Sequence, residues 1–185
     1  IQKEVAHLDH TMQGFLDYAR PSNLKRAMVE PAEFLKAVVR LLGDDIELIV
    51  ADELPTIALD SDRILQVLRN LVRNAREAAP EEKIELLGND RGDYFVMEVR
   101  DRGPGISLEL KDQLFIPFVT NKSGGTGLGL AISQRIVKDH RGRLELRPRE
   151  GGGTVARMLL PRLPLSVEES TPPERLPHAQ EGDRS

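Results

Sequence analysis

The chain has 185 residues, of which 39% are hydrophobic and 30% are charged, and its net charge is −4 at neutral pH. These values fit one globular domain with appendages and argue against a broad, non-specific nucleic-acid binder. Cysteine is absent, which excludes disulfides and cysteine-ligated zinc, and no apolar run approaches the ~20 residues that span a bilayer. We expect a cytoplasmic domain of a longer protein, because the chain opens on Ile1 and any membrane or sensory segment would lie upstream.

Residues 1–20 carry apolar side chains at alternating spacings of four and three, and Pro21 ends the pattern. This spacing is typical of the seam of a helix that packs against other helices. One helix cannot bury such a seam alone, so its partners come from outside the chain or from a second copy. We therefore predict a helix over 1–22, a globular domain over 23–163, and a disordered tail over 164–185, where proline and polar residues dominate.

A long helix is expected over 62–79, with Asp60 or Ser61 as its N-cap and Pro80 just beyond its end. Its apolar side chains form one buried stripe. The other expected elements are helices over 31–42 and 127–141, strands over 46–51, 55–59, 84–87, 94–99, 143–148 and 154–160, and a turn at 89–92. Because these elements lack a regular βαβ rhythm, we predict an α+β fold, a two-layer sandwich with helices on one face of a mixed sheet.

The segment 103–125 shows no long periodic pattern, apart from a stretch at 108–114 that fits a short helix. A loop-rich segment of this length inside a domain is usually functional, often as a lid. It runs through Lys122 into the glycines of 124–129 and then directly into a helix. The unpaired N–H groups of such a helix start can receive a phosphate, although a glycine-rich loop is also common as a plain connection.

Four polar residues of the long helix, Asn70, Arg73, Asn74 and Glu77, share a face opposite the apolar stripe. This set fits an ordinary solvated face equally well as a metal–phosphate face. In the second interpretation an asparagine oxygen ligates a Mg²⁺ ion that bridges nucleotide phosphates, and Arg73 contacts a phosphate oxygen.

Asp101 follows directly on a predicted strand, with Gly103 and Gly105 close behind it. The simplest interpretation is an Asx turn, in which the glycines only turn the chain. Alternatively, the carboxylate accepts a hydrogen bond from an exocyclic amine while the glycine backbone approaches a flat ring.

Other motifs do not fit. The chain has no Walker-type loop, no serine in a Gly-x-Ser-x-Gly elbow, and the glycine spacing at 125–129 differs from a dinucleotide-binding fingerprint. His7 and His10 share a predicted helix, while His140 and His178 stand apart, so no histidine pair has metal-ligand spacing.

Taken together, the motifs resemble the catalytic, ATP-binding domain of bacterial sensor histidine kinases, within the GHKL ATPase superfamily. The resemblance covers roughly residues 25–162 and implies a Bergerat-type sandwich. Its blocks are 66–78, 101–106, 115–118 and 125–130, with 152–154 and 160–161 at the end of the domain. The segment 120–122, Thr-Asn-Lys, is most similar to the nitrogen-regulation type of kinase.

This resemblance implies ATP and Mg²⁺ as cofactors. Asn74 is implied to be the metal ligand, and Asn70, Asn74 and Lys122 are implied to be the catalytic residues at the triphosphate. Asp101 is implied to bind the adenine amino group, while Phe115 and Phe118 anchor the lid. The full set implied at the nucleotide is Asn70, Arg73, Asn74, Asp101, Gly103, Gly105, Ile106, Phe118, Lys122, Gly125, Thr126, Gly127, Leu128, Gly129 and Thr154.

Two positions depart from relatives. Hydrolysing members such as gyrase carry a glutamate base where this chain has Asn70, which favours transfer to a protein acceptor over hydrolysis. Many kinases carry lysine where this chain has Glu77, which leaves the phosphate contacts on that turn to Arg73 and Lys122.

Residues 1–22 resemble the second helix of the dimerisation and phosphoacceptor hairpin. The acceptor histidine is therefore expected outside the chain, and the implied partners are that hairpin, a response regulator and, in the full-length protein, a second copy. We predict the kinase core of a sensor histidine kinase; the alternatives are a non-catalytic nucleotide-sensing module and a GHKL-type ATPase.

Overall fold

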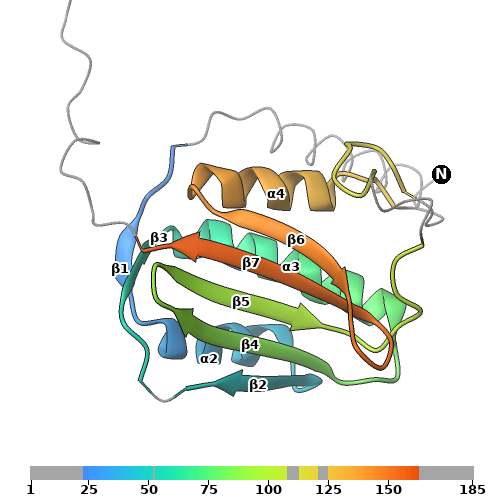
Figure 1. Ribbon diagram of the computed structural model, residues 1–185, viewed down its shortest axis with the longest axis horizontal. Coiled ribbons are helices and arrows are strands. Elements are labelled where there is room, and N and C mark those ends of the chain that lie inside the picture. Colours follow the sequence, from blue (N-terminus) through green and yellow to red (C-terminus); the bar gives the residue numbers. More distant parts are fainter. Residues whose placement is uncertain (1–22, 52, 108–112, 121–124, 163–185) are drawn as a thin grey trace, which may run out of the picture.

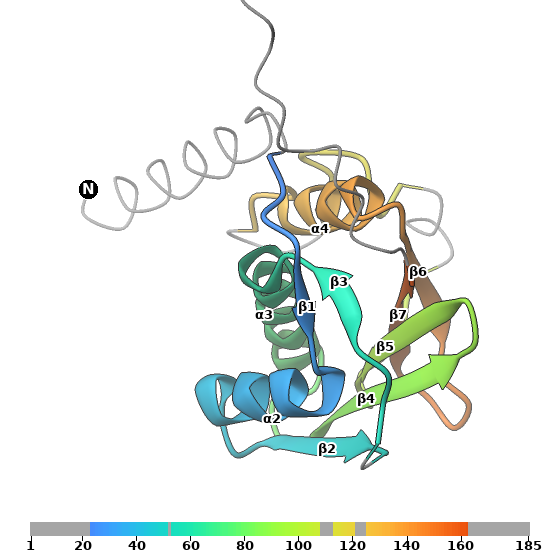
Figure 2. The ribbon, with the colours of Figure 1, turned by 90° about the vertical axis from the view of Figure 1, so that its left-hand side faces the viewer.

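The computed structural model describes residues 23–51, 53–107, 113–120 and 125–162. In this part the chain forms a two-layer sandwich, with a mixed sheet on one side and helices stacked on the other (Figure 2). The predicted α+β sandwich is confirmed. The predicted helix over 1–22, the tail from 164, most of the stretch at 108–114, and Lys122 lie outside the described residues.

The main sheet has five strands in the order β2-β4-β5-β7-β6. Their bounds are β2 (Ile46–Val50), β4 (Ile84–Arg91), β5 (Tyr94–Arg100), β7 (Thr154–Pro161) and β6 (Arg143–Pro148). The β2–β4 pair is parallel and the other pairs are antiparallel. A separate antiparallel pair joins β1 (Ala27–Val29) to β3 (Ile57–Leu59).

Three helices of the described part cover one face of this sheet, each over different strands (Figure 1). Helix α2 (Pro31–Leu42) lies behind β2 and β4, α3 (Ser61–Ala78) lies behind the middle of the sheet, and α4 (Gly129–Asp139) lies along β6. No helix in the described part is both long and apolar enough to cross a membrane.

Helix α3 is fixed by its cap and by its buried stripe. The Asp60 side chain accepts a hydrogen bond of 3.1 Å from the Arg63 N–H, which satisfies one of the first unpaired donors of the helix. Ile64, Val67 and Leu68 are each 0% exposed and belong to a core that also includes the sheet residues facing the helices. Each such aliphatic side chain contributes about 1.5–3 kcal/mol by leaving water, so this stripe holds the helix in place.

Two of the departures from the predicted elements arise from strand pairing. The predicted turn at 89–92 is wrong by two residues, because β4 continues to Arg91 and β5 begins at Tyr94. Gly92, with φ +70°, allows this two-residue connection, and pairing with β5 overrides the poor strand preference of Asn89. Strand β1 was not predicted, because its three residues are too few to show a period and depend on β3 for pairing.

The uncovered face of the sheet keeps its central carboxylate neutralised by arginines. Glu98 is 3% exposed and accepts hydrogen bonds of 2.9 Å from Arg100 Nε and 2.5 Å from Arg157 Nε. Burial acts to raise the pKa of Glu98, but the hydrogen bonds and charges of Arg100 and Arg157 outweigh it and lower that pKa. The carboxylate is therefore ionised and paired on the face of the sheet that lies away from the described helices.

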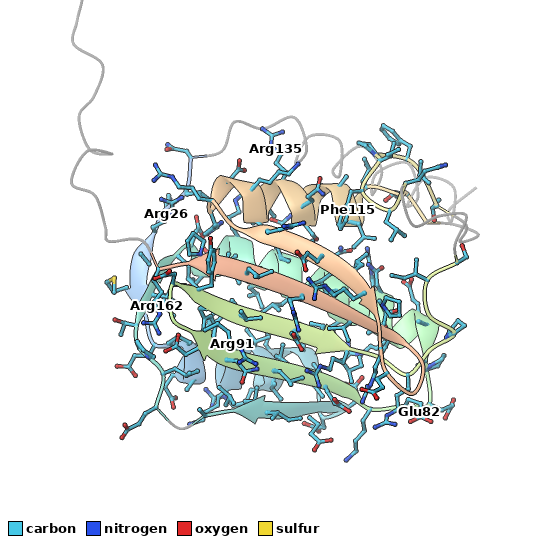
Figure 3. All side chains as sticks on the ribbon, viewed as in Figure 1. Arg26, Glu82, Arg91, Phe115, Arg135 and Arg162 are labelled. Carbon is cyan, nitrogen blue, oxygen red and sulfur yellow. The ribbon has the colours of Figure 1, made fainter. Side chains whose placement is uncertain are left out.

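His140 ties the C-terminal end of α4 to the start of α3. Its Nε2 accepts a 3.0 Å hydrogen bond from the Asp60 N–H, and its Nδ1 donates to the Ile136 carbonyl at 2.8 Å. The incoming chain joins the same junction, because the Lys25 N–H donates to Asp60 Oδ2 and Arg26 donates to the Asp139 carbonyl (Figure 3). Only a neutral imidazole can accept at Nε2, and burial lowers the pKa of His140 accordingly.

This junction predicts a pH dependence of stability. Because the pKa of His140 is lower in the folded chain than the usual 6.5, the unfolded chain binds this proton more readily, and stability falls as the pH drops through and below about 6.5. We expect the melting temperature of His140→Gln to depend less on pH between about 7.5 and 5.5 than that of the wild type. Thermal unfolding at several pH values measures this. Equal slopes for His140→Gln and wild type would contradict the assignment.

Candidate functional site

A cavity of about 290 Å³ lies between α3, the adjoining ends of β5 and β7, and the segments that lead into α4. Its lining includes many of the residues singled out from the sequence: Asn70, Arg73, Asn74, Asp101, Ile106, Gly125, Thr126, Gly127, Gly129 and Thr154. Residues that are far apart in the chain thus meet around one hollow.

The polar face of α3 forms one wall of the cavity. Arg73 Nη2 donates to Asn70 Oδ1 at 2.9 Å, and Arg73 Nε lies 3.9 Å from Glu77 Oε1. Asn70 Nδ2 in turn donates to Ser133 Oγ of α4 at 3.0 Å. Asn74 lines the cavity half-buried, and no described side chain or backbone group forms a hydrogen bond with its amide. Asn74 is therefore the amide on this wall whose oxygen is available to a ligand.

Asp101 closes the cavity at the end of β5. The side chain is 7% exposed, and its Oδ1 accepts hydrogen bonds from the Gly103 N–H at 2.9 Å and the Thr154 N–H at 3.1 Å. The Asx turn is therefore present, and the same carboxylate also lines the cavity. Since both of these bonds end on Oδ1, Oδ2 keeps its capacity to accept from a ligand.

The glycines before α4 are required by contacts within the protein. A Cβ on Gly127, which has φ +66°, would lie 2.5 Å from the Phe118 carbonyl carbon, and the Phe118 N–H donates to the Gly127 carbonyl at 3.2 Å. A Cβ on Gly129 would lie 2.3 Å from Asn70 Oδ1. Both values are shorter than real contacts, so Gly127 lets the lid segment pack closely and Gly129 lets α3 approach α4.

The start of α4 is electrostatically open. Its N-cap residue, Leu128, makes no side-chain capping bond, and the first turn contains no acidic residue. The first N–H groups of a helix lack partners within the helix, and the helix dipole adds positive potential at the same place. This end of the cavity therefore suits an anion.

Some of the expected residues lie off the cavity lining. Gly103 packs against Ala78, Leu128 is 1% exposed under α4, and Gly105 turns the chain with φ +81°. Phe118 has φ +68° and is 58% exposed.

Phe115, labelled in Figure 3, is half-buried and packs against the core. Of the two aromatic side chains expected to anchor the lid, Phe115 thus makes the core contact, whereas Phe118 contributes its backbone bond to Gly127.

The apolar lining was missed by sequence reasoning. It is formed by side chains of α3, α4, β5, β6, β7 and the lid segment: Leu71, Ala75, Ala78, Val99, Leu114, Val119, Leu130, Leu146 and Ala156. Most of these continue the helix and strand periods that mark the core, so the pattern alone cannot separate core from cavity floor. Alanine at three of these positions is the one available signal, because small side chains leave space.

A metal ion would have few protein ligands here. Within the described ranges, no group of three or more histidine or acidic side chains is arranged to hold a metal. Mg²⁺ that binds together with phosphates keeps most of its waters and needs only one or two protein oxygens. The single available amide of Asn74 fits that type of site.

Comparison with known proteins agrees with this geometry. Residues 59–164 match the family described as histidine kinase-, DNA gyrase B-, and HSP90-like ATPase. The sensor histidine kinase ZraS of Escherichia coli K12 is 31% identical over 167 residues, which is 86% of this chain and 36% of ZraS. The chain therefore spans about a third of this relative.

Solved kinase structures show the same fold. Full-length ShkA in complex with AMPPNP matches with a TM-score of 0.73 and 28% identity, over 84% of this chain and 36% of ShkA. The histidine kinase ThkA in complex with the response regulator protein TrrA matches with a TM-score of 0.71 and 29% identity, over 88% of this chain and 49% of ThkA. On its matching family pattern, its shared fold and its cavity, the chain belongs to the histidine kinase-, DNA gyrase B-, and HSP90-like ATPase family.

Proposed function

We propose that this chain is the ATP-binding kinase core of a two-component sensor histidine kinase. One observation carries the proposal: Asp101, Asn74 and the uncapped start of α4 surround a single cavity with an apolar floor. These groups supply, in order, an acceptor for a base, an oxygen for a cation and donors for phosphates.

In this proposal the adenine ring lies on the apolar floor formed by residues such as Val99 and Leu146, and its amino group donates to Asp101. Asn74 holds Mg²⁺, which neutralises phosphate charge when bound. The N–H groups at the start of α4, together with Thr126, receive the phosphates, and Lys122 adds a cation from the lid.

The lining favours transfer over hydrolysis. Hydrolysis needs a base that activates water, and the residue one turn before Asn74 is Asn70, a neutral amide already bonded to Arg73 and Ser133. In the transfer reaction a nitrogen of an acceptor histidine attacks the γ-phosphorus, the bond to the ADP oxygen breaks, and the histidine proton passes to solvent. Positioning and charge neutralisation supply most of the rate in such reactions.

In this proposal the acceptor histidine is supplied by the helical hairpin of the full-length kinase. The phosphoryl group then passes to an aspartate of a response regulator; a complex of this kind is named for ThkA, whose fold this chain shares. The full-length protein dimerises through the hairpin, and the reaction takes place in the cytoplasm, where ATP is available.

A transfer assay tests the proposal. The chain is mixed with radiolabelled ATP, Mg²⁺ and the hairpin of a full-length relative that bears the acceptor histidine. We expect acid-labile label on the hairpin. In Asn74→Asp we expect at least a tenfold loss of label, because a negatively charged carboxylate replaces the neutral amide that holds the cation beside the phosphates. Asn23→Asp, on an exposed residue, is the matched control.

Two other outcomes would replace the proposal. Tight nucleotide binding without transfer would indicate a non-catalytic nucleotide sensor, and phosphate release without an acceptor would indicate an ATPase.

The Asp101 carboxylate gives a separate prediction. In Asp101→Asn the side-chain oxygen can still accept from the Gly103 and Thr154 N–H groups, whereas the new NH₂ opposes the adenine amino group. We therefore expect about tenfold or greater weakening of ATP binding, with a small change in melting temperature without nucleotide. Calorimetric titration and thermal unfolding measure the two effects, with Asp93→Asn in the exposed hairpin turn as control. A large fall in melting temperature with unchanged affinity would make Asp101 a structural turn residue only.

A further inference from the structure

Helices α3 and α4 meet through one polar contact at the cavity. The Asn70 amide nitrogen donates to Ser133 Oγ at 3.0 Å, and Ser133 is 1% exposed. The amide oxygen of the same side chain lies so close to α4 that a Cβ on Gly129 would be only 2.3 Å from it. Gly129 and Ser133 are four residues apart and so share one face of α4. Asn70 therefore lies across the first turn of α4 and touches it at two points.

The hydrogen bond between Asn70 and Ser133 is partly shielded from water, since Ser133 is buried and Asn70 is half-buried. A side-chain hydrogen bond that is shielded from water is stronger than an exposed one, and loss of one partner leaves the other unsatisfied. Glycine at position 129 leaves room for the amide oxygen, and the Ser133 hydroxyl oxygen accepts the hydrogen bond from the amide nitrogen. Arg73 adds a third contact, since its guanidinium donates 2.9 Å to the same amide oxygen. Both polar atoms of the Asn70 amide thus have a partner within the protein.

The contact joins the two elements that surround the phosphate end of the cavity, which are α3 with Asn74 and the first turn of α4. Asn70 and Asn74 lie one turn apart on α3, so the residue that contacts α4 and the residue available to a cation have a fixed relation to each other. Gly129 and the N–H groups of the first turn of α4 lie directly beside the contact. Asp101 and Ile106, in contrast, reach the cavity from β5 and the loop that follows it.

We propose that Asn70, Ser133 and Gly129 form an interhelical clasp that sets the position of the phosphate-receiving start of α4 relative to the metal-binding Asn74. Asn70 and Ser133 are then positioning residues for the polyphosphate and its cation, and they leave the adenine end of the site unaffected. The proposal rests on the proposed function, and it changes the expected part of Asn70 from a ligand of the triphosphate to a support for the groups that bind it.

A purely structural contact would have a different signature. If the clasp only stabilised the fold, its loss would lower the affinity for every ligand by the same factor. After correction for the folded fraction, no affinity would change. If the clasp positions the phosphate-binding groups, its loss lowers the affinity more for a ligand that carries more phosphates. A series of ligands that share adenosine and differ in phosphates separates these cases.

The experiment measures the affinities of adenosine, Mg·ADP and Mg·ATP for the wild type and Ser133→Ala, by titration at a temperature where both are folded. We expect Mg·ATP to bind about tenfold more weakly to Ser133→Ala, while adenosine changes by less than about twofold. Gly129→Ala, which displaces the Asn70 amide from the other side, should give the same selective loss. Lys138→Ala, exposed on α4 and outside the cavity lining, is the matched control and should behave as the wild type.

The other partner of the hydrogen bond gives an independent test of the clasp. Asn70→Ala should reproduce the selective loss, and the double variant Asn70→Ala with Ser133→Ala should lose little more than either single variant, since both break one contact.

Equal weakening of adenosine and Mg·ATP, or unchanged Mg·ATP binding in folded Ser133→Ala and Asn70→Ala, would overturn the clasp while leaving the proposed function intact. Failure of the wild type to bind either phosphate ligand would overturn both.

Discussion

The packing of α3 against the sheet is the contact on which the rest of the structure depends. One face of this helix places Ile64, Val67 and Leu68 at 0% exposure in the core. The helical period then turns Asn70 and Asn74 towards the cavity on the other side. The position of both asparagines is therefore set by aliphatic burial elsewhere on the same helix. The Asp60 cap and the His140 contact fix the start of α3, and Asn70 joins its cavity side to α4.

The cavity exists where this packing becomes incomplete. Along α3 the buried leucines and valines give way to Ala75 and Ala78, and Ala156 faces them from β7. These small side chains leave a hollow whose floor is apolar and whose rim carries Asp101 and Asn74. An apolar lining with a few placed polar groups is the usual composition of a small-molecule site. The same layer of side chains thus serves as core at one end of α3 and as a binding surface at the other.

Local patterns were sufficient to predict the main elements and most of the polar residues that face the cavity. Asn70 and Asn74 could be found because two asparagines inside a helix disfavour it and share one face, and Asp101 because it follows a strand and precedes glycines. Contacts between distant segments could not be found in this way. The bond from Asn70 to Ser133 joins positions 63 residues apart, and the need for glycine at position 129 arises only when α3 approaches. Strand β1 likewise depends on its partner and carries no period of its own.

The central claim is that one Mg·nucleotide occupies the cavity between α3, Asp101 and the start of α4. The most direct measurement is an NMR titration of the isotope-labelled chain with Mg·ATP, followed through its backbone amide signals. The account predicts that the largest changes fall at Asn74, Asp101 and the first turn of α4, while signals around Glu98 and Arg157 on the uncovered face of the sheet stay in place. Changes confined to that uncovered face, or no change at saturating nucleotide, would contradict it.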